Sequence, residues 1–367
     1  MIFIIKGKYY ELKDLDPKID NEFVRLNSSF LSNHPYKWDD FKSESTKFFD
    51  KTLKNSKIHD DFFNNFTIIW QNLLKSGKYD EAETIWTMAL SIAIEWEMKN
   101  PNQFIHKGTP FYFWGVTVIL RGNLEKGYSL MHQALQEDIR TTGCILPNTP
   151  SLAFAMLDYS RNEQAFKPWL IEQAVFINKH IEDYCESYGS QFNIEMFRIN
   201  FLNSPPSADI IYLFSYIVAK LLQIQKMPPY ILRNDFASQM QLELLFNLSL
   251  VIDAVIKVKN PKQYKFIDLI AFLAKKSKLT INKTKLRLIN KEFNHDFMKT
   301  LSLLKNGGFI YPDFSSPSGL EVDIAITYGI RNRGAHDPSS ISSFYNDFQF
   351  IEQMLFNVLF LSIEIPN

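Results

Sequence analysis

Two arginines, an asparagine and a histidine lie close together near the C-terminus, in the segment Arg331–His336 (RNRGAH). A guanidinium group binds phosphate oxygens through paired hydrogen bonds. A histidine takes up and releases a proton near neutral pH. Arg331, Asn332, Arg333 and His336 therefore supply the groups that a phosphodiester-cleaving site needs when it uses no metal ion.

Helical signals on both sides of this segment should position its side chains. The spacing of a capping box at residues 318–321 predicts a helix that begins near Gly319. Gly334 is placed to end that helix. Asp337 and Pro338 have the pattern of an N-cap and first turn, so they predict the start of a final helix. We therefore expect the motif at a junction between two helices, where the second N-terminus favours an anion.

The pattern R-N-x-x-x-H formed by Arg331, Asn332 and His336 resembles the signature of the HEPN superfamily of helical ribonucleases and nucleotide-binding proteins. An apolar helix predicted over residues 242–258 carries one acidic residue, Asp253, much like the first helix of that fold. The resemblance spans roughly residues 235–367. A lone acid on an apolar helix is expensive to bury, so we expect Asp253 to have a basic or hydrogen-bonding neighbour.

The resemblance implies a C-terminal bundle of four or five helices and a metal-independent endoribonuclease. His336 would act as acid or base when the ribose 2′-hydroxyl attacks, Arg331 would stabilise the charge on phosphorus, and Asn332 would orient the phosphate or the histidine. Such proteins usually form two-fold dimers that join two motifs in one cleft. By fold analogy the chain would be a toxin or antiviral (anti-phage) defence effector. The alternative is a non-catalytic interaction protein whose HEPN-like domain dimerises or binds nucleotide.

Positive charge is concentrated before the motif, although the whole chain has a formal net charge of zero. Between residues 251 and 310, 12 lysines and one arginine stand against four acidic residues, a net charge of +9. Two interpretations stay open, a solvated helix face and a path for an RNA backbone. The candidate nucleic-acid-binding residues are Arg333, Lys275, Lys276, Lys278, Lys283, Lys285, Arg287 and Lys291.

The N-terminal half contains two similar helix pairs. Gly77 and Gly122 are 45 residues apart, and Ala82 and Gly127 repeat the same offset. This pattern resembles tetratricopeptide repeats, which form surfaces for a protein partner or a sensor ligand. The chain is therefore predicted to be all-α, with four regions: an N-terminal β-hairpin and cap (1–56), tetratricopeptide-like helix pairs (57–145), connecting helices (146–230) and the HEPN-like domain (231–367).

Other classes of function have no support in the sequence. None of the seven histidines has a partner at metal-ligand spacing, and no glycine-rich nucleotide-binding motif is present, so we expect no metal and no cofactor. We expect no signal peptide and no membrane span, since no apolar run approaches the roughly 18–20 residues that a span requires. We therefore expect a cytoplasmic protein without a membrane partner.

The final predicted helix, residues 344–363, is apolar on more than one face. A helix that is apolar nearly all round must be buried on nearly all sides. A four-helix domain covers one broad face of its last helix, so we expect the remainder to meet a second copy of the chain. The sequence thus predicts a homodimer through the C-terminal domain.

Overall fold

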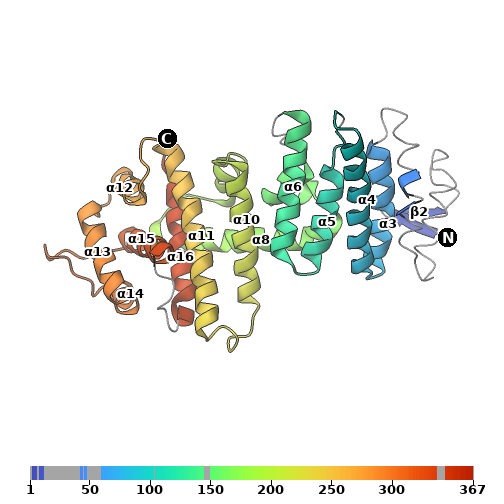
Figure 1. The fold of residues 1–367 in the computed structure, drawn as a ribbon. Coiled ribbons are helices and arrows are strands. Elements are labelled where there is room, and N and C mark those ends of the chain that lie inside the picture. The colour runs from blue at the N-terminus through green and yellow to red at the C-terminus, as the bar shows by residue number, and fades with distance from the viewer. Residues whose placement is uncertain are drawn as a thin grey trace. The chain divides into compact units, whose positions relative to one another are not determined.

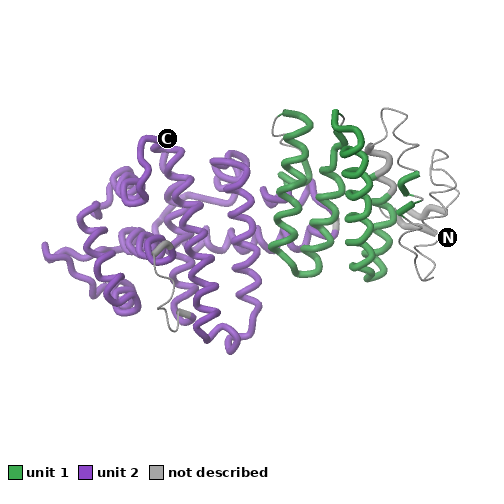
Figure 2. The backbone as a smooth tube through the Cα atoms, in the orientation of Figure 1, with its two compact units in different colours: residues 1–153 green, residues 154–367 purple. Residues whose placement is uncertain are grey.

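In a computed structural model of the chain, the structure describes residues 59–336 and 344–366 except 103 and 144–148, together with 2–5, 8–11, 42–43 and 45–47. The chain divides into two compact units, residues 1–153 and 154–367 (Figure 2). Every regular element whose side chains are described is a helix. The all-α class is therefore confirmed for this part of the chain.

Unit 1 contains two helix–turn–helix pairs (Figure 1). Their helices are α3 (His59–Lys75), α4 (Tyr79–Lys99), α5 (Gly108–Leu120) and α6 (Leu124–Thr142). Two short strands are assigned before them, β1 (Ile2–Ile5) and β2 (Lys8–Glu11). A short helix, α7 (Pro150–Ala155), lies at the boundary between the units.

The glycines of the repeated pattern have two different structural roles, in turns and in helix packing. Gly77 and Gly122 have φ angles of +69° and +89°, so both turn the chain between paired helices in a conformation that favours glycine. Gly127 instead allows close helix packing, because a Cβ atom there would lie 2.2 Å from Cγ1 of Ile119. Both roles follow from the sequence pattern that indicated helix pairs.

Unit 2 is a larger helical assembly. Its α-helices are α8 (Lys167–Tyr188), α9 (Ile194–Phe197), α10 (Ala208–Gln225), α11 (Asp235–Lys259), α12 (Phe266–Lys276), α13 (Lys283–His295), α14 (Phe297–Lys305), α15 (Leu320–His336) and α16 (Phe348–Glu364). The short helical turns are η2 (Tyr159–Arg161), η3 (Gln164–Phe166), η4 (Arg198–Leu202) and η6 (Phe344–Asp347).

Helix α16 is the core of unit 2. It runs beside α11 and also packs on α8 and α15 (Figure 1). Its side chains Leu355, Phe356, Val358, Leu359 and Phe360 have no exposed surface. The expectation that α16 needs a second chain to cover it is therefore wrong. The reason is that α8, from the region predicted to connect two domains, supplies the missing cover within the same unit.

Helix α10 is the one helix in the described residues that is long and apolar enough to cross a membrane. Within unit 2, 56% of its apolar stretch is buried. A core helix of a soluble protein passes the same test of length and composition, so α10 is weak evidence for a membrane span.

Candidate functional site

The arginine–histidine motif lies inside the last turns of α15, not after the end of that helix. α15 continues through Gly334 to His336, and Gly334 is not among the residues with positive φ. A Cβ atom at Gly334 would lie 2.5 Å from the Phe246 ring. The predicted helix stop at Gly334 is therefore wrong, because this glycine serves a close approach between α15 and α11.

The predicted junction also differs from the structure. The next described helix begins only at Phe348, after the short turn η6. Asp337 and Pro338, predicted to start it, lie outside the described residues. Glu321, predicted to complete a capping box with Ser318, instead accepts hydrogen bonds from the backbone N–H groups of Thr280 and Ile281 at 2.6 and 3.0 Å.

Arg331 contacts three side chains of α11 and α12. Its guanidinium carbon lies 4.9 Å from the centre of the Phe246 ring and 5.9 Å from that of Phe266. Its Nη2 lies 3.9 Å from Oδ2 of Asp253, and 22% of the Arg331 side chain remains exposed. Among the described residues, no group accepts a hydrogen bond from its Nε. That Nε is buried, so the exposed part of Arg331 lies elsewhere on the side chain, which two rings and a carboxylate hold in position.

Asp253 has the basic neighbour that its apolar helix predicted. Burial raises the pKa of the Asp253 carboxyl above its ordinary value, while the charges of Arg331 and Lys257 act in the opposite direction. The ion pair with Arg331 is long, at 3.9 Å. Asp253 therefore helps to orient Arg331 without neutralising it through a close two-pronged contact.

Asn332 connects α15 to α13. Its Nδ2 donates a 2.8 Å hydrogen bond to Oδ1 of Asn290. The next residue, Arg333, is buried, with 8% of its surface exposed. Arg333 was predicted to contact nucleic acid, and its burial does not fit an open phosphate contact. For His336 the structure describes the helical backbone and not the side chain.

Helical spacing relates the motif residues to one another. Positions four apart share a face of an α-helix, so Asn332 and His336 lie on one side of α15. Arg331 and His336 are five apart, which separates them by about 140° around the helix axis. One copy of α15 therefore does not put these two positions on the same face.

The predicted basic path is centred on α13. On that helix, residues at intervals of four form one exposed stripe: Lys283, Arg287, Lys291 and His295. The opposite side packs into the core through Leu286, Ile289 and Phe293. Lys275, Lys276 and Lys278 are also exposed, at the end of α12 and just after it.

Two of the predicted cations already have acidic partners. Lys283 Nζ lies 2.6 Å from Oδ1 of Asp268. Lys285 is only 14% exposed; it donates to Ser315 Oγ at 2.9 Å and lies 3.6 Å from Oδ2 of Asp313. Lys285 is thus better placed to fix the loop before α15 than to contact RNA.

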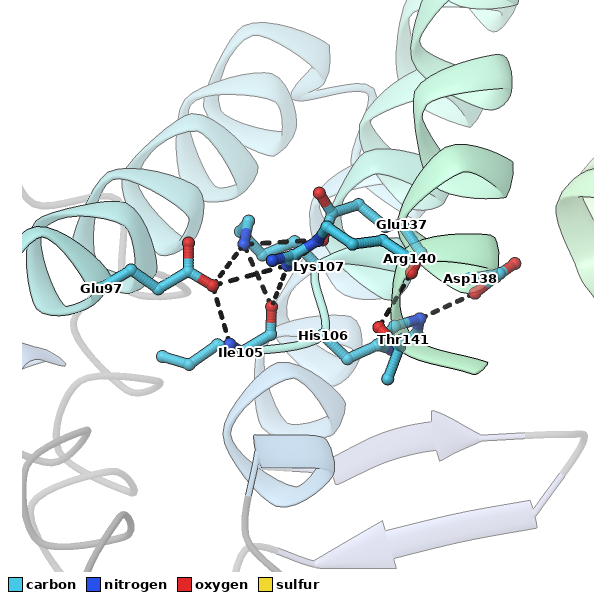
Figure 3. A network of polar contacts seen from close by, with 8 residues as sticks. All are labelled: Glu97, Ile105, His106, Lys107, Glu137, Asp138, Arg140 and Thr141. Atoms are coloured by element: carbon cyan, nitrogen blue, oxygen red, sulfur yellow. Dashed lines mark hydrogen bonds and ion pairs between the residues drawn. The ribbon is translucent and has the colours of Figure 1, made fainter. Parts of the chain in front are cut away.

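A second group of charges lies in unit 1, where the loop between α4 and α5 meets α6 (Figure 3). Lys107 Nζ lies 2.7 Å from Oε1 of Glu97 and 3.5 Å from Oε2 of Glu137. Arg140 donates to Glu137 at 2.7 Å and to the carbonyl of Ile105 at 3.1 Å. Lys107 is only 5% exposed, so these opposite charges compensate one another and hold the loop.

His106 extends this group (Figure 3). Its Nε2 lies 2.7 Å from Oδ1 of Asp138, whose other oxygen accepts a 3.2 Å hydrogen bond from Ser151 Oγ. Serine and histidine both bind the carboxylate rather than each other, so the geometry is not that of an activated nucleophile. The sequence did not indicate this pair, because no local pattern links residues 32 positions apart.

The start of α15 is tied to α8 and α16 by a buried polar network that the sequence did not indicate. Asp323 is 1% exposed and accepts hydrogen bonds from Tyr188 Oη at 2.6 Å and Asn357 Nδ2 at 2.9 Å. Burial raises the pKa of Asp323 to about 7, although both hydrogen bonds oppose that shift. This network fixes the position of α15 within unit 2.

Comparison with known proteins does not assign the chain to a family. No protein-family model matches it, and no curated protein or solved structure is significantly similar to it. Within the described residues, no group of three or more histidine, cysteine, aspartate or glutamate side chains could hold a metal ion. The candidate site therefore depends on the chemistry and geometry of α15 and its neighbours.

Proposed function

We propose that the chain is a metal-independent endoribonuclease of the HEPN type. The observation that carries the proposal is that the Arg331 side chain is both oriented and partly exposed. Its guanidinium is oriented by two aromatic rings and by Asp253, yet it remains partly exposed. A cation that is oriented before substrate binds is suited to stabilise charge that develops in a transition state.

The proposed reaction uses groups of this chain and the RNA. The ribose 2′-hydroxyl attacks the adjacent phosphorus, and the 5′-oxygen leaves. His336 takes the proton of the 2′-hydroxyl or gives one to the leaving 5′-oxygen, and the second motif of the proposed dimer makes the other transfer. Arg331 stabilises the negative charge on the phosphate oxygens. Asn332, whose amide is bonded to Asn290, orients the phosphate or the histidine. The product would carry a 2′,3′-cyclic phosphate.

We further propose that the active form is a homodimer through the C-terminal domain. The angular separation of the Arg331 and His336 positions on one α15 supports this view, since a second copy could bring complementary groups to the same phosphate. The burial of α16 within its own unit gives no support to that helix as the interface.

The decisive experiment is incubation of a labelled RNA with purified protein in excess EDTA. We expect cleavage by the wild type, 2′,3′-cyclic phosphate ends and no cleavage by His336→Ala. A matching DNA lacks the 2′-hydroxyl and should stay intact. Activity that disappears in EDTA and returns with Mg²⁺ would contradict the mechanism.

The second candidate function is a non-catalytic interaction protein. It is favoured by the burial of Arg333 and by the contacts that already engage Arg331, since both arginines could be structural. In that case the protein would bind RNA or nucleotide without cutting it. Intact RNA in the EDTA experiment, together with a retained gel shift, would support this function.

Several further features belong to the proposal. They are the N-terminal hairpin, the likeness of the helix pairs to tetratricopeptide repeats and the likeness of residues 231–367 to a HEPN bundle. We also propose a cytoplasmic toxin or antiviral defence effector, with the helix pairs binding a protein partner or sensor ligand. The two turns at Gly77 and Gly122 support the repeat assignment.

A further inference from the structure

The loop between α14 and α15 presents an unusually exposed aromatic ring. Phe314 is 92% exposed, more than any other large apolar side chain in the described residues. Its φ angle is +60°, a conformation that a bulky non-glycine residue rarely adopts. Exposure and backbone strain both disfavour phenylalanine here, so its presence points to a role other than stability.

This loop is internally braced. The backbone N–H of Phe314 donates to the carbonyl of Tyr311 at 2.9 Å, and the N–H of Tyr311 donates to the carbonyl of Ser315 at 2.8 Å. The Ser315 hydroxyl donates to Asp313 at 2.5 Å. Tyr311 anchors the loop, because only 2% of its surface is exposed. The Phe314 ring is therefore offered to solvent from an ordered loop, which lowers the entropic cost of binding.

Helix α13 connects this loop to the proposed site. Lys285, in its first turn, donates to Ser315 and lies 4.7 Å from the centre of the Tyr311 ring. Asn290 follows five residues later, about 7.5 Å along the helix, and bonds to Asn332. Figure 1 shows the loop projecting beside α13. Lys285 and Asn290 are not members of the exposed stripe, but α13 carries both of them together with Lys283, Arg287, Lys291 and His295, so one helix joins the loop, the stripe and the motif.

We propose that Phe314 is a stacking platform for an unpaired base of single-stranded RNA. The phosphates on one side of that base would follow the cations of the α13 stripe toward Asn332. This inference rests on the proposed function and narrows its substrate class. An exposed aromatic ring on a loop that is braced by a helix with exposed cations complements an anionic chain of stackable bases, whereas an apolar protein partner would not need those cations.

The platform selects for single strands because of how bases are arranged in a duplex. Paired bases are stacked on each other and do not offer a face to a protein side chain. RNA loops and ends can turn a base outward onto an aromatic ring. Phe314 should therefore affect single-stranded RNA and leave duplex binding unchanged.

The test measures binding separately from cleavage. The probe is a short fluorescein-labelled oligouridine with methylated 2′-oxygens, which blocks attack by the 2′-hydroxyl. Fluorescence anisotropy should show that Phe314→Ala weakens binding about five- to a hundredfold, and that Phe314→Trp keeps it. Phe236→Ala is the matched control, since Phe236 is 71% exposed on α11 outside the basic segment. Phe314→Gly fits the positive φ and separates loss of the ring from loss of folding.

Each outcome separates the inference from the function on which it rests. If the wild type binds and cuts RNA and Phe314→Ala binds equally well, the platform is refuted while the ribonuclease stands. Equal weakening of single-stranded and duplex RNA would also refute the platform. If the wild type neither binds nor cuts RNA, both proposals fail, and the exposed ring is better explained by a protein partner.

Discussion

The shape of the Arg331 side chain matters as much as its charge. A guanidinium is flat and can lie against Phe246 while it donates to a phosphate, whereas a lysine ammonium is a point charge. We predict that Arg331→Lys lowers the rate of RNA cleavage about 100-fold or more. Loss of the ring contacts should lower the free energy of unfolding by about 0.5–2 kcal/mol. Single-turnover cleavage and urea denaturation measure the two effects.

A comparison with Arg331→Ala separates charge from shape. If Arg331→Lys cleaves RNA at the wild-type rate, and both variants differ from the wild type only in the free energy of unfolding, the guanidinium is a structural group. That result would favour the non-catalytic interaction protein.

Asp323 makes stability depend on pH in a definite direction. Folding raises the pKa of its carboxyl from about 3.8 to about 7. Between these values the folded protein binds more protons than the unfolded chain, so the free energy of unfolding falls as pH rises and levels off above about 7. We predict that in Asp323→Asn the free energy of unfolding falls by on the order of 4 kcal/mol less over this pH range than in the wild type.

Urea denaturation between about pH 4 and pH 8 measures this effect. Glu292→Gln, at an exposed acid on α13, is the control and should leave the pH profile unchanged. An Asp323→Asn profile that is parallel to the wild type would show that Asp323 does not titrate in this range.

At the scale of the elements, the packing of α15 on α11 depends on Gly334. Alanine is the better helix former, yet its Cβ would collide with Phe246. We predict that Gly334→Ala destabilises the protein by about 1–2 kcal/mol. It should also lower cleavage, because Phe246 orients Arg331. Thermal denaturation should show that adding Phe246→Leu recovers part of the stability; a more stable single mutant would contradict the tight contact.

Gly334 also shows where sequence reasoning reaches its limit. Connecting helices were predicted over residues 146–230, and α10 (Ala208–Gln225) lies in that region. The same reasoning predicted the start of α15 but ended it too early. A glycine near a helix end can reverse the chain or admit a neighbouring ring, and the choice depends on α11, which is distant in sequence.

The α13 stripe leads to a prediction about salt. Each phosphate contact adds about 0.7 to the slope of log affinity against log salt for single strands. The triple variant Lys283→Gln, Arg287→Gln, Lys291→Gln should therefore lower that slope by about 2. Lys285→Gln is the internal comparison, since Lys285 is bound to Ser315 and should alter stability more than slope. An unchanged slope in the triple variant would place the RNA elsewhere.

The stripe was partly readable from the sequence. Intervals of four residues on a predicted helix place Lys283, Arg287 and Lys291 on one face. The sequence does not show that Lys285 turns away to brace a loop, or that Arg333 is buried. Those outcomes depend on which helix packs beside each residue. For the same reason, Asp253 predicted a basic partner but not that the partner was Arg331.

At the scale of the whole molecule, the proposed dimer can be tested with inactive chains. We predict a dimer by light scattering at micromolar concentration. A mixture of Arg331→Ala and His336→Ala chains should not recover full cleavage, because each shared site still lacks groups. A monomer with full ribonuclease activity would refute the shared site and leave the single motif as the catalyst.

The central position of α16 has a consequence for synthesis of the chain. α8 is complete at Tyr188, but its partner α16 begins at Phe348. At typical translation rates this interval lasts on the order of ten seconds. Until then, the apolar sides of α8 and α11 have no α16 to cover them. Helix α11, which contacts Arg331, therefore lacks one of the helices that pack against it. A product terminated before residue 348 would therefore lack the core that positions this arginine and should be a substrate for chaperones and proteases.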